Sequence, residues 1–323
     1  TSDRDATMWM RKSIVVLVIN LFNFIFLLTA HAAIQASGSI TEDTTWTAAE
    51  THHVVGNVTV QSGVTLTIEA GTIVKFDEGI GITANQGNLY AVGAVGNEII
   101  FTSWRDDSVG EDVSGLGTDS GHPGDWNRLD LENVSPTYTS LAHCEVRYGG
   151  SGSFGSVYLY SADITVADTV ITGGSSHGIY TRYSSPLIER CTVTGNAGRG
   201  VYLRDTGSPT VRDSEVSDNG TGIYVEGTSI PTLEGNTVTG NSAWGVYFTS
   251  GPSAPVLSGN TVTGNLRGVM IPASAVPNAS DGNVLAPNSI NGVWIRGNAR
   301  SADLTLTVQH AGEAHEINTY QVD

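Results

Sequence analysis

Short apolar segments that end in glycine or asparagine recur along the chain at a nearly constant spacing. One series is centred on a branched apolar residue in phrases such as CTVTGN and NTVTGN, and a second follows a glycine in phrases such as GVYLR and GIYVE. The spacing is 22 to 28 residues in the first series and 22 to 24 in the second. The centres of the first series are Val146, Ile171, Val193, Val216, Val238, Val262 and Ile290. The centres of the second series are Tyr158, Tyr180, Tyr202, Tyr224, Tyr247, Met270 and Trp294.

This period predicts an all-β solenoid. Each repeat alternates apolar and polar residues over three to five positions and is interrupted by Gly, Asn and Pro, which is typical of short strands joined by turns. One repeat cannot bury its own apolar face, whereas stacked repeats can. We therefore expect a single-stranded parallel β-helix with three short strands per turn and about 22 to 24 residues per turn. A β-propeller needs about 40 residues per blade, which this period does not fit.

Strand alternation predicts which side chains point into the coil. Val193, Val201 and Leu203 are expected to point inward, and Tyr202 and Arg204 outward. A column of small polar side chains is also expected inside, where its members hydrogen-bond one another. This column contains Cys144, Thr169, Cys191, Ser214, Asn236, Asn260 and Asn288.

The two cysteines occupy this column two turns apart. Strand spacing then separates Cys144 from Cys191 by about 9.6 Å, which exceeds the roughly 7 Å that a disulfide tolerates. We therefore expect two free, buried thiols without a catalytic role.

The chain is expected to divide into six segments. Met8 to Lys12 and the apolar stretch Ile14 to Leu28 precede an A-x-A site, a pattern typical of a secretory signal peptide cut after Ala32. A retained membrane anchor is the weaker alternative, because the stretch is shorter than the ~20 residues that a span requires. The segments are upstream read-through at 1–7, the signal peptide at 8–32, an N-terminal cap with the first turns at 33–103, an acidic loop at 104–126, regular turns at 127–299 and the truncated start of a further unit at 300–323.

The segment from Gly38 to Ser103 resembles the N-terminal module of bacterial secreted or cell-surface proteins with right-handed parallel β-helix repeats, in the pectate-lyase-like superfamily. The phrases that carry the resemblance are VTV at 58–60, SGVTLTIEAGTIVKF, GNLYAVGAVGNEIIFTS and the Asp125-Trp126 pair that starts the next turn. The resemblance implies a right-handed coil and an extracellular or cell-surface setting. It does not imply one activity, because such repeats occur in lyases, hydrolases, epimerases and adhesins.

Charge narrows the range of partners. The chain has 32 acidic and 15 basic side chains and a net charge of −17, and Lys75 is the only lysine beyond residue 32. Nucleic-acid binding is therefore not expected. We also expect no membrane span after signal cleavage, and a monomer that forms one module of a longer chain.

The catalytic motifs of related enzymes are absent. Pectin hydrolases of this fold carry a Gly-His-Gly segment, whereas this chain has Ser176-His177-Gly178, and the Asp-Pro-His-Asp signature of uronate epimerases is missing. The sequence therefore favours a non-catalytic scaffold or adhesin that binds extracellular polysaccharide or surface glycan. A polysaccharide lyase or glycoside hydrolase is the alternative.

An outward strip of tyrosine and arginine is the predicted glycan site, because sugar rings bind aromatic faces with polar groups at the edge. The alternative is that stacked tyrosines only stabilise the coil. The predicted site contains Tyr158, Tyr180, Arg182, Tyr202, Arg204, Tyr224, Glu226, Tyr247 and Trp294.

Two further surfaces carry weaker predictions. Threonine doublets at 192/194, 237/239 and 261/263 form ranks like those of ice-binding solenoids. After glycan binding and polysaccharide catalysis, the third functional hypothesis is therefore ice binding or a purely structural spacer. The acidic loop is a candidate Ca²⁺ site, because carboxylate oxygens suit a hard cation. Its predicted ligands are Asp106, Asp107, Glu111, Asp112, Asp119 and Asp125.

Overall fold

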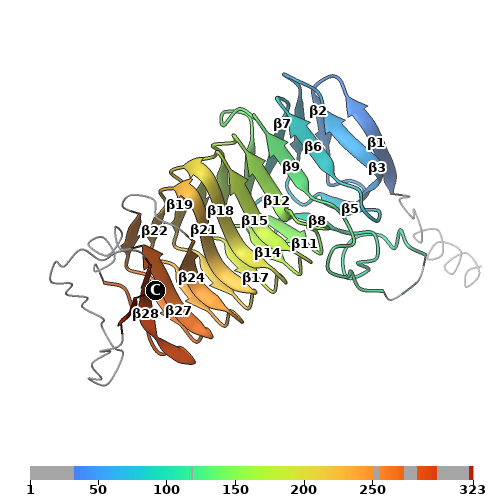
Figure 1. Ribbon diagram of the computed structural model, residues 1–323. Helices are drawn as coiled ribbons and strands as arrows, with labels where there is room; N and C mark the ends of the chain where they lie inside the picture. The colour runs from blue at the N-terminus through green and yellow to red at the C-terminus, as the bar shows by residue number, and fades with distance from the viewer. Residues whose placement is uncertain are drawn as a thin grey trace, which may run out of the picture. The chain divides into compact units, whose positions relative to one another are not determined.

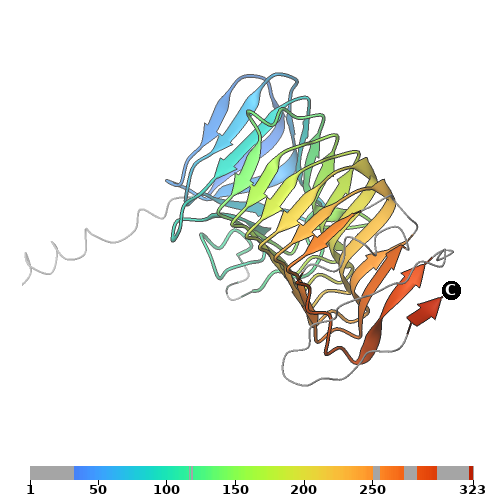
Figure 2. The same ribbon diagram turned by 90° about the vertical axis from the view of Figure 1, so that its left-hand side faces the viewer.

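The computed structural model describes residues 33–115, 117, 119–249, 255–272, 282–296 and 320–322. Every regular element in these residues is a β-strand. Within the described residues, no helix has the length and hydropathy that a membrane span requires. Neighbouring strands pair in parallel along each ladder, so the coil runs in one direction. Figures 1 and 2 show the strands stacked in chain order from the blue β1 (Ile34–Ile40) to the orange-red β28 (Ile290–Arg296). The predicted signal peptide and residues 300–319 lie outside the described residues.

Each regular turn contributes one strand to each of three ladders, as predicted. The first ladder is a nine-stranded sheet. Its strands are β2 (Thr44–Trp46), β4 (Thr65–Ile68), β7 (Asn88–Val92), β10 (Ser140–Ala142), β13 (Thr165–Ala167), β16 (Leu187–Glu189), β19 (Thr210–Arg212), β22 (Thr232–Glu234) and β25 (Val256–Ser258).

The second and third ladders are joined near the N-terminal end of the coil into one 20-stranded sheet, because the long strand β3 (His52–Val60) pairs with both β5 (Ile73–Phe76) and β6 (Ile82–Asn85). Strand β1 lies beside β3. The second ladder contains β5, β8 (Ile99–Ser103), β11 (Cys144–Arg147), β14 (Val170–Thr172), β17 (Thr192–Thr194), β20 (Glu215–Ser217), β23 (Thr237–Thr239) and β26 (Thr261–Thr263). The third contains β6, β9 (Leu129–Glu132), β12 (Gly155–Tyr160), β15 (His177–Arg182), β18 (Arg199–Gly207), β21 (Thr221–Ser229), β24 (Trp244–Phe248), β27 (Arg267–Pro272), β28 and β29 (Tyr320–Val322).

Alternation places the apolar side chains inside the coil, as predicted. Val193, Val201 and Leu203 have no exposed surface, whereas Thr192 and Arg204 on the same strands are partly exposed. Because a side chain from each turn stacks on its counterpart in the next, the core is one continuous apolar cluster that runs along the coil.

Polar side chains form two buried columns inside this core. The predicted column is confirmed through Asn260, but its next member is Asn283 and not Asn288, since the Asn260 amide donates to Asn283 Oδ1 at 2.9 Å. The sequence alignment failed there because Thr261 pairs with Val284, while Ile290 begins β28 and pairs with Arg267 of the third ladder. The second column consists of Asn196, Asn219, Asn241, Asn265 and Asn288, each donating to the next.

The two cysteines lie in the first column with Thr169 between them, and both are free and buried. Burial raises the pKa of each thiol to about 12. The prediction of two free thiols is confirmed, and a thiolate nucleophile is not available near neutral pH.

Candidate functional site

The outer face of the third ladder carries the predicted aromatic column, and its register is confirmed. Tyr180 lies opposite Tyr158 on one side and Tyr202 on the other, and the column continues in step to Trp294. Arg182 and Arg204 form a parallel column two residues further along the strands, followed by Glu226 in the next turn. The sequence period therefore places these side chains on one surface.

The ring faces of three tyrosines are not free for a sugar, which corrects the prediction for Tyr158, Tyr180 and Tyr202. These side chains are only 4–5 % exposed. Tyr180 and Tyr202 stack on each other with centroids 4.4 Å apart and planes 5° apart, and Tyr158 packs 5.3 Å from Tyr180. Because strands lie only about 4.8 Å apart, Tyr180 and Tyr202 cover each other's ring faces, and Tyr158 packs at a tilt against Tyr180.

A glycine-rich segment adds an aromatic side chain that the repeat pattern does not contain. Residues 149–153 read GGSGS and lead to Phe154, whose ring meets Tyr158 edge-on at 5.0 Å. The Arg128 guanidinium lies 4.2 Å from the Phe154 ring centroid. Phe154 therefore closes one end of the aromatic cluster.

The structure brings part of the predicted set together in a groove of about 530 Å³ beside the tyrosine edges. Arg182, Arg204, Tyr180 and Tyr202 of the prediction line this groove. The lining also includes Phe154, Ser176, His177 and Arg199, and residues 152–153. Tyr158, Tyr224, Glu226, Tyr247 and Trp294 are not among its lining residues.

Acidic side chains hold the two outer arginines in place. Arg182 Nε lies 2.6 Å from Asp205 Oδ2, and Arg204 Nε lies 3.7 Å from Asp205 and 3.8 Å from Glu226. Arg204 also donates to the Tyr180 hydroxyl at 3.2 Å, and the Tyr202 hydroxyl donates to Glu226. Arg182 and Arg204 therefore line the groove, while their carboxylate partners lie beside it.

His177 and Arg199 form the opposite edge, and the sequence prediction missed both. They occupy the same place in successive repeats, directly before the strand glycine in HGIYTR and RGVYLR, and this correspondence is the signal that could have found them. The Arg199 guanidinium lies 4.3 Å from the Tyr202 ring centroid and 3.8 Å from that of Tyr224. The aromatic rings thus hold Arg199 in a fixed position.

The residues outside the groove continue the aromatic column. Tyr224 and Tyr247 stack with centroids 5.2 Å apart, and Trp294 meets Trp244 edge-on at 4.9 Å. Arg267 lies 5.4 Å from the Trp244 ring centroid. These contacts support the alternative reading of the column as a stabiliser of the coil at this end.

Burial of His177 makes the stability of the fold depend on pH. Desolvation, followed by the charge of Arg199, lowers the pKa of His177 to about 4 from its usual 6.5. Between these two values the unfolded chain takes up a proton and the folded chain does not, so stability falls as the pH is lowered through this range. We expect His177 to contribute a loss of about 2 kcal/mol in the free energy of unfolding between pH 7 and pH 5.

Urea unfolding at the two pH values measures this effect. His177→Asn should reduce the pH dependence but leave a remainder, because burial also lowers the pKa of His52. His122, whose side chain is 62 % exposed, provides the control as His122→Asn. An unchanged pH dependence in His177→Asn would contradict the assignment.

The acidic loop packs against the second ladder through buried polar contacts. Lys75 is fully buried and donates to the Glu111 carbonyl, and buried Asp106 accepts from Thr102 at 2.6 Å and from Arg147 at 3.3 Å. Hydrogen bonds from Ser108 and Thr102 outweigh burial and lower the pKa of Asp106. Lys75 is thus held by a backbone carbonyl of the loop, and Asp106 by side chains of the second ladder.

The predicted calcium ligands do not form one cluster. Asp112 accepts from Ser114, and Asp119 pairs with Arg105 at 3.2 Å. Asp125 accepts from Ser103, and Asp107 accepts from the Asp119 amide. Across the described residues, no three His, Cys, Asp or Glu side chains converge as a metal site requires. Calcium binding by the loop stays a prediction without a built site.

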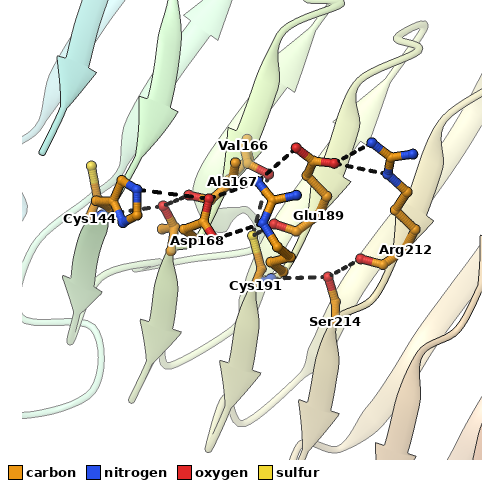
Figure 3. A network of polar contacts seen from close by, with 11 residues as sticks. Cys144, Val166, Ala167, Asp168, Glu189, Cys191, Arg212 and Ser214 are labelled. Carbon is orange, nitrogen blue, oxygen red and sulfur yellow. Dashed lines mark hydrogen bonds and ion pairs between the residues drawn. The ribbon is translucent and has the colours of Figure 1, made fainter. Parts of the chain in front are cut away.

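A charge network lies where the first ladder passes to the second (Figure 3). Asp168 accepts two hydrogen bonds from Arg190, both at 2.8 Å, and Arg190 in turn lies 2.9 Å from Glu189. Arg212 approaches the other oxygen of Glu189 at 2.5 Å. Hydrogen bonds from these arginines lower the pKa of both carboxylates. Because its charges are matched, this network ties three turns together and offers no unpaired charge to a ligand.

The threonine ranks lie in register on the second ladder. Thr192, Glu215 and Thr237 are successive partners, and Ser217 donates to Thr194 at 3.1 Å. Glu215 therefore interrupts the rank with a charge, as the sequence indicates. Ice binding by this face stays a prediction.

The matching family models agree with the architecture. The family described as "Right handed beta helix region" matches residues 133–307, and "Pectate-lyase like beta helix domain" matches residues 38–153. No curated protein matches the chain. Among solved structures, the chain is similar to the periplasmic alginate epimerase AlgG, with 13 % sequence identity, a TM-score of 0.37, and coverage of 89 % of this chain and 76 % of that one.

Proposed function

Because the chain belongs to the right-handed β-helix family, with pectate-lyase-like repeats, we propose that it binds polysaccharide in the groove on the third ladder as a non-catalytic module. The observation that carries this proposal is a groove of about 530 Å³ with aromatic edges and two arginines, Arg182 and Arg204, in its lining. The carboxylates of Asp205 and Glu226, which lie beside the groove, hold these arginines in place. Sites for small ligands and sugars combine such a concave surface with a few fixed polar groups.

The chemistry of this edge suits sugar hydroxyl groups. A hydroxyl both donates and accepts, so it can bridge Arg204 and the carboxylate of Asp205 or Glu226. The ion pairs hold the side chains before the ligand arrives, which lowers the entropic cost of binding. The spacing of the turns, about 4.8 Å, repeats such contacts along an extended chain.

The proposed setting is outside the cytoplasm, at the cell surface or secreted. The predicted signal peptide at residues 8–32 supports this proposal, as do the pectate-lyase-like repeats. A polymer in this setting can lie along the stacked turns, whereas a small metabolite would use only one of them.

Removal of the two outer arginines tests the proposal. We expect the double variant Arg182→Ala/Arg204→Ala to bind about tenfold or more weakly than the parent protein to a polysaccharide that the parent recognises. The reason is that each substitution removes hydrogen bonds to the ligand. Isothermal titration against a panel of neutral and acidic polysaccharides provides the measurement. Arg212→Ala, which removes an arginine of the first ladder, is the matched control and should bind like the parent.

The same experiment separates binding from catalysis. Release of unsaturated oligosaccharides would establish a lyase, and release of reducing ends a hydrolase. Unchanged affinity in the double variant would remove the groove as the binding site. Ice recrystallisation inhibition without glycan binding would favour the threonine face instead.

A further inference from the structure

The contact between His177 and Arg199 places two hydrogen-bond donors against each other. His177 Nδ1 accepts from the backbone amide of Arg199 at 3.1 Å. This amide belongs to β18 and cannot turn away, so Nδ1 carries no hydrogen. A neutral imidazole then carries its hydrogen on Nε2. Nε2 lies 3.2 Å from Nη1 of Arg199, which is also a donor.

Two hydrogen-bond donors that point toward the same place, with no acceptor between them, can both bind one anion. Both residues line the groove, and His177 is only 8 % exposed, so the imidazole sits in a preformed wall and not on a mobile surface. A carboxylate or sulfate oxygen that reaches both Nε2–H and the guanidinium would satisfy them together. Neutral hydroxyl groups would satisfy them less well, because hydrogen bonds to a charged acceptor are stronger.

The charge of Arg199 is not compensated within the described part of the chain. No carboxylate of the described residues lies within 4.0 Å of its guanidinium, whereas Arg182, Arg204 and Arg212 each have an acidic partner. The Arg199 guanidinium lies over the rings of Tyr202 and Tyr224, whose planes are 88° apart, so aromatic contacts on two sides fix its position.

We propose that His177 Nε2–H and the guanidinium of Arg199 form an anion subsite that binds one carboxylate or sulfate group of the polysaccharide. The inference rests on the proposed function of the groove and extends it to the ligand's charge. In this arrangement Arg182 and Arg204 bind hydroxyl groups, while His177 and Arg199 select chains that carry an anionic substituent.

Two polymer pairs that differ only in charge test the subsite. Polygalacturonate is compared with its fully methyl-esterified form, and dextran sulfate with dextran, by isothermal titration on the purified protein. We expect the parent protein to bind at least one charged polymer about tenfold or more tightly than its neutral counterpart. The first pair identifies a carboxylate as the ligand group and the second identifies a sulfate ester.

Two variants assign the preference to the subsite. His177→Asn keeps an acceptor for the Arg199 amide and removes the Nε2–H donor, and Arg199→Gln removes the guanidinium. Each should lower affinity for the charged polymer about tenfold and lower affinity for the neutral polymer by less, so that the ratio of the two affinities falls. Arg212→Gln is the charge-matched control, and thermal melting shows whether a variant is folded.

The outcomes separate this inference from the proposed function. Equal affinity of the parent protein for charged and neutral polymers overturns the subsite and leaves binding in the groove intact. A charge preference that persists in both folded variants also overturns the subsite. Failure to bind any polymer overturns both proposals.

Discussion

Replacement of Asn241 by leucine is expected to lower the free energy of unfolding by about 4 kcal/mol or more. Asn241 is 1 % exposed and lies in the middle of the second buried column. Its amide donates to Asn265 Oδ1 at 2.8 Å and to the Val216 carbonyl at 3.1 Å, and its Oδ1 accepts from the backbone of Asn219 at 3.0 Å. Leucine has a similar size but makes none of these bonds, so the buried Asn219 amide loses its acceptor and the Val216 carbonyl and Asn265 Oδ1 each lose a donor.

Urea unfolding followed by circular dichroism measures the loss. Asn85→Leu is the matched control, because Asn85 is exposed and donates to Glu132 on the outer surface. We expect the control to change stability by less than about 1 kcal/mol. A loss of similar size in both variants would show that the buried column does not contribute specifically.

Replacement of Gly222 by alanine is expected to cost about 3 kcal/mol or more. A Cβ atom at this position would lie 2.5 Å from the Gly245 carbonyl oxygen, 2.6 Å from Val238 Cγ1 and 2.9 Å from the side-chain nitrogen of Asn241. These distances are far shorter than van der Waals contacts, and the neighbouring turns would have to separate to admit the methyl group. The strand glycine therefore allows close approach of the turns.

Gly79→Ala is the control for the backbone effect of a glycine substitution. Gly79 has a φ of +71°, and a Cβ atom added there would meet no atom within 4 Å, so alanine meets only conformational strain of about 1 kcal/mol. Thermal and urea unfolding of both variants should rank Gly222→Ala as clearly the less stable. The opposite order would show that the turns can separate at low cost.

The second asparagine column and the strand glycines also position the groove. The glycine before each outer strand, including Gly178 and Gly200, packs against an asparagine of the second column and a valine of the second ladder. His177 and Arg199 directly precede these glycines and thus take the same position in successive turns. Substitutions in the interior that loosen the stacking are therefore expected to disturb the binding edge as well.

Much of the candidate site could be found from the period of the sequence. Tyr180, Arg182, Tyr202 and Arg204 were predicted to share one surface, and the register confirms it. The sequence did not show that the ring faces of Tyr180 and Tyr202 cover each other, because ring orientation depends on side-chain rotamers that the period does not specify. It also did not show Phe154 at the end of the column, because this residue comes from a loop outside the repeat.

The loop carboxylates show a second limit of sequence reasoning. Clustering along the chain suggested a shared cation, yet Asp106, Asp112 and Asp119 each accept hydrogen bonds from different partners in the fold. Proximity along an irregular loop does not determine where side chains converge, because the loop has no fixed period.

The sequence by itself determined the parallel coil, its three strands per turn and the inward or outward direction of most side chains. It could do so because strand alternation and stacking repeat with the period of the chain. Only the tertiary structure decided which outward groups are accessible and which charges are compensated. Arg182 meets Asp205 from the next turn, whereas Arg199 meets aromatic rings and a histidine. These contacts depend on side-chain directions and on loops that interrupt the repeat, and neither is encoded in the period.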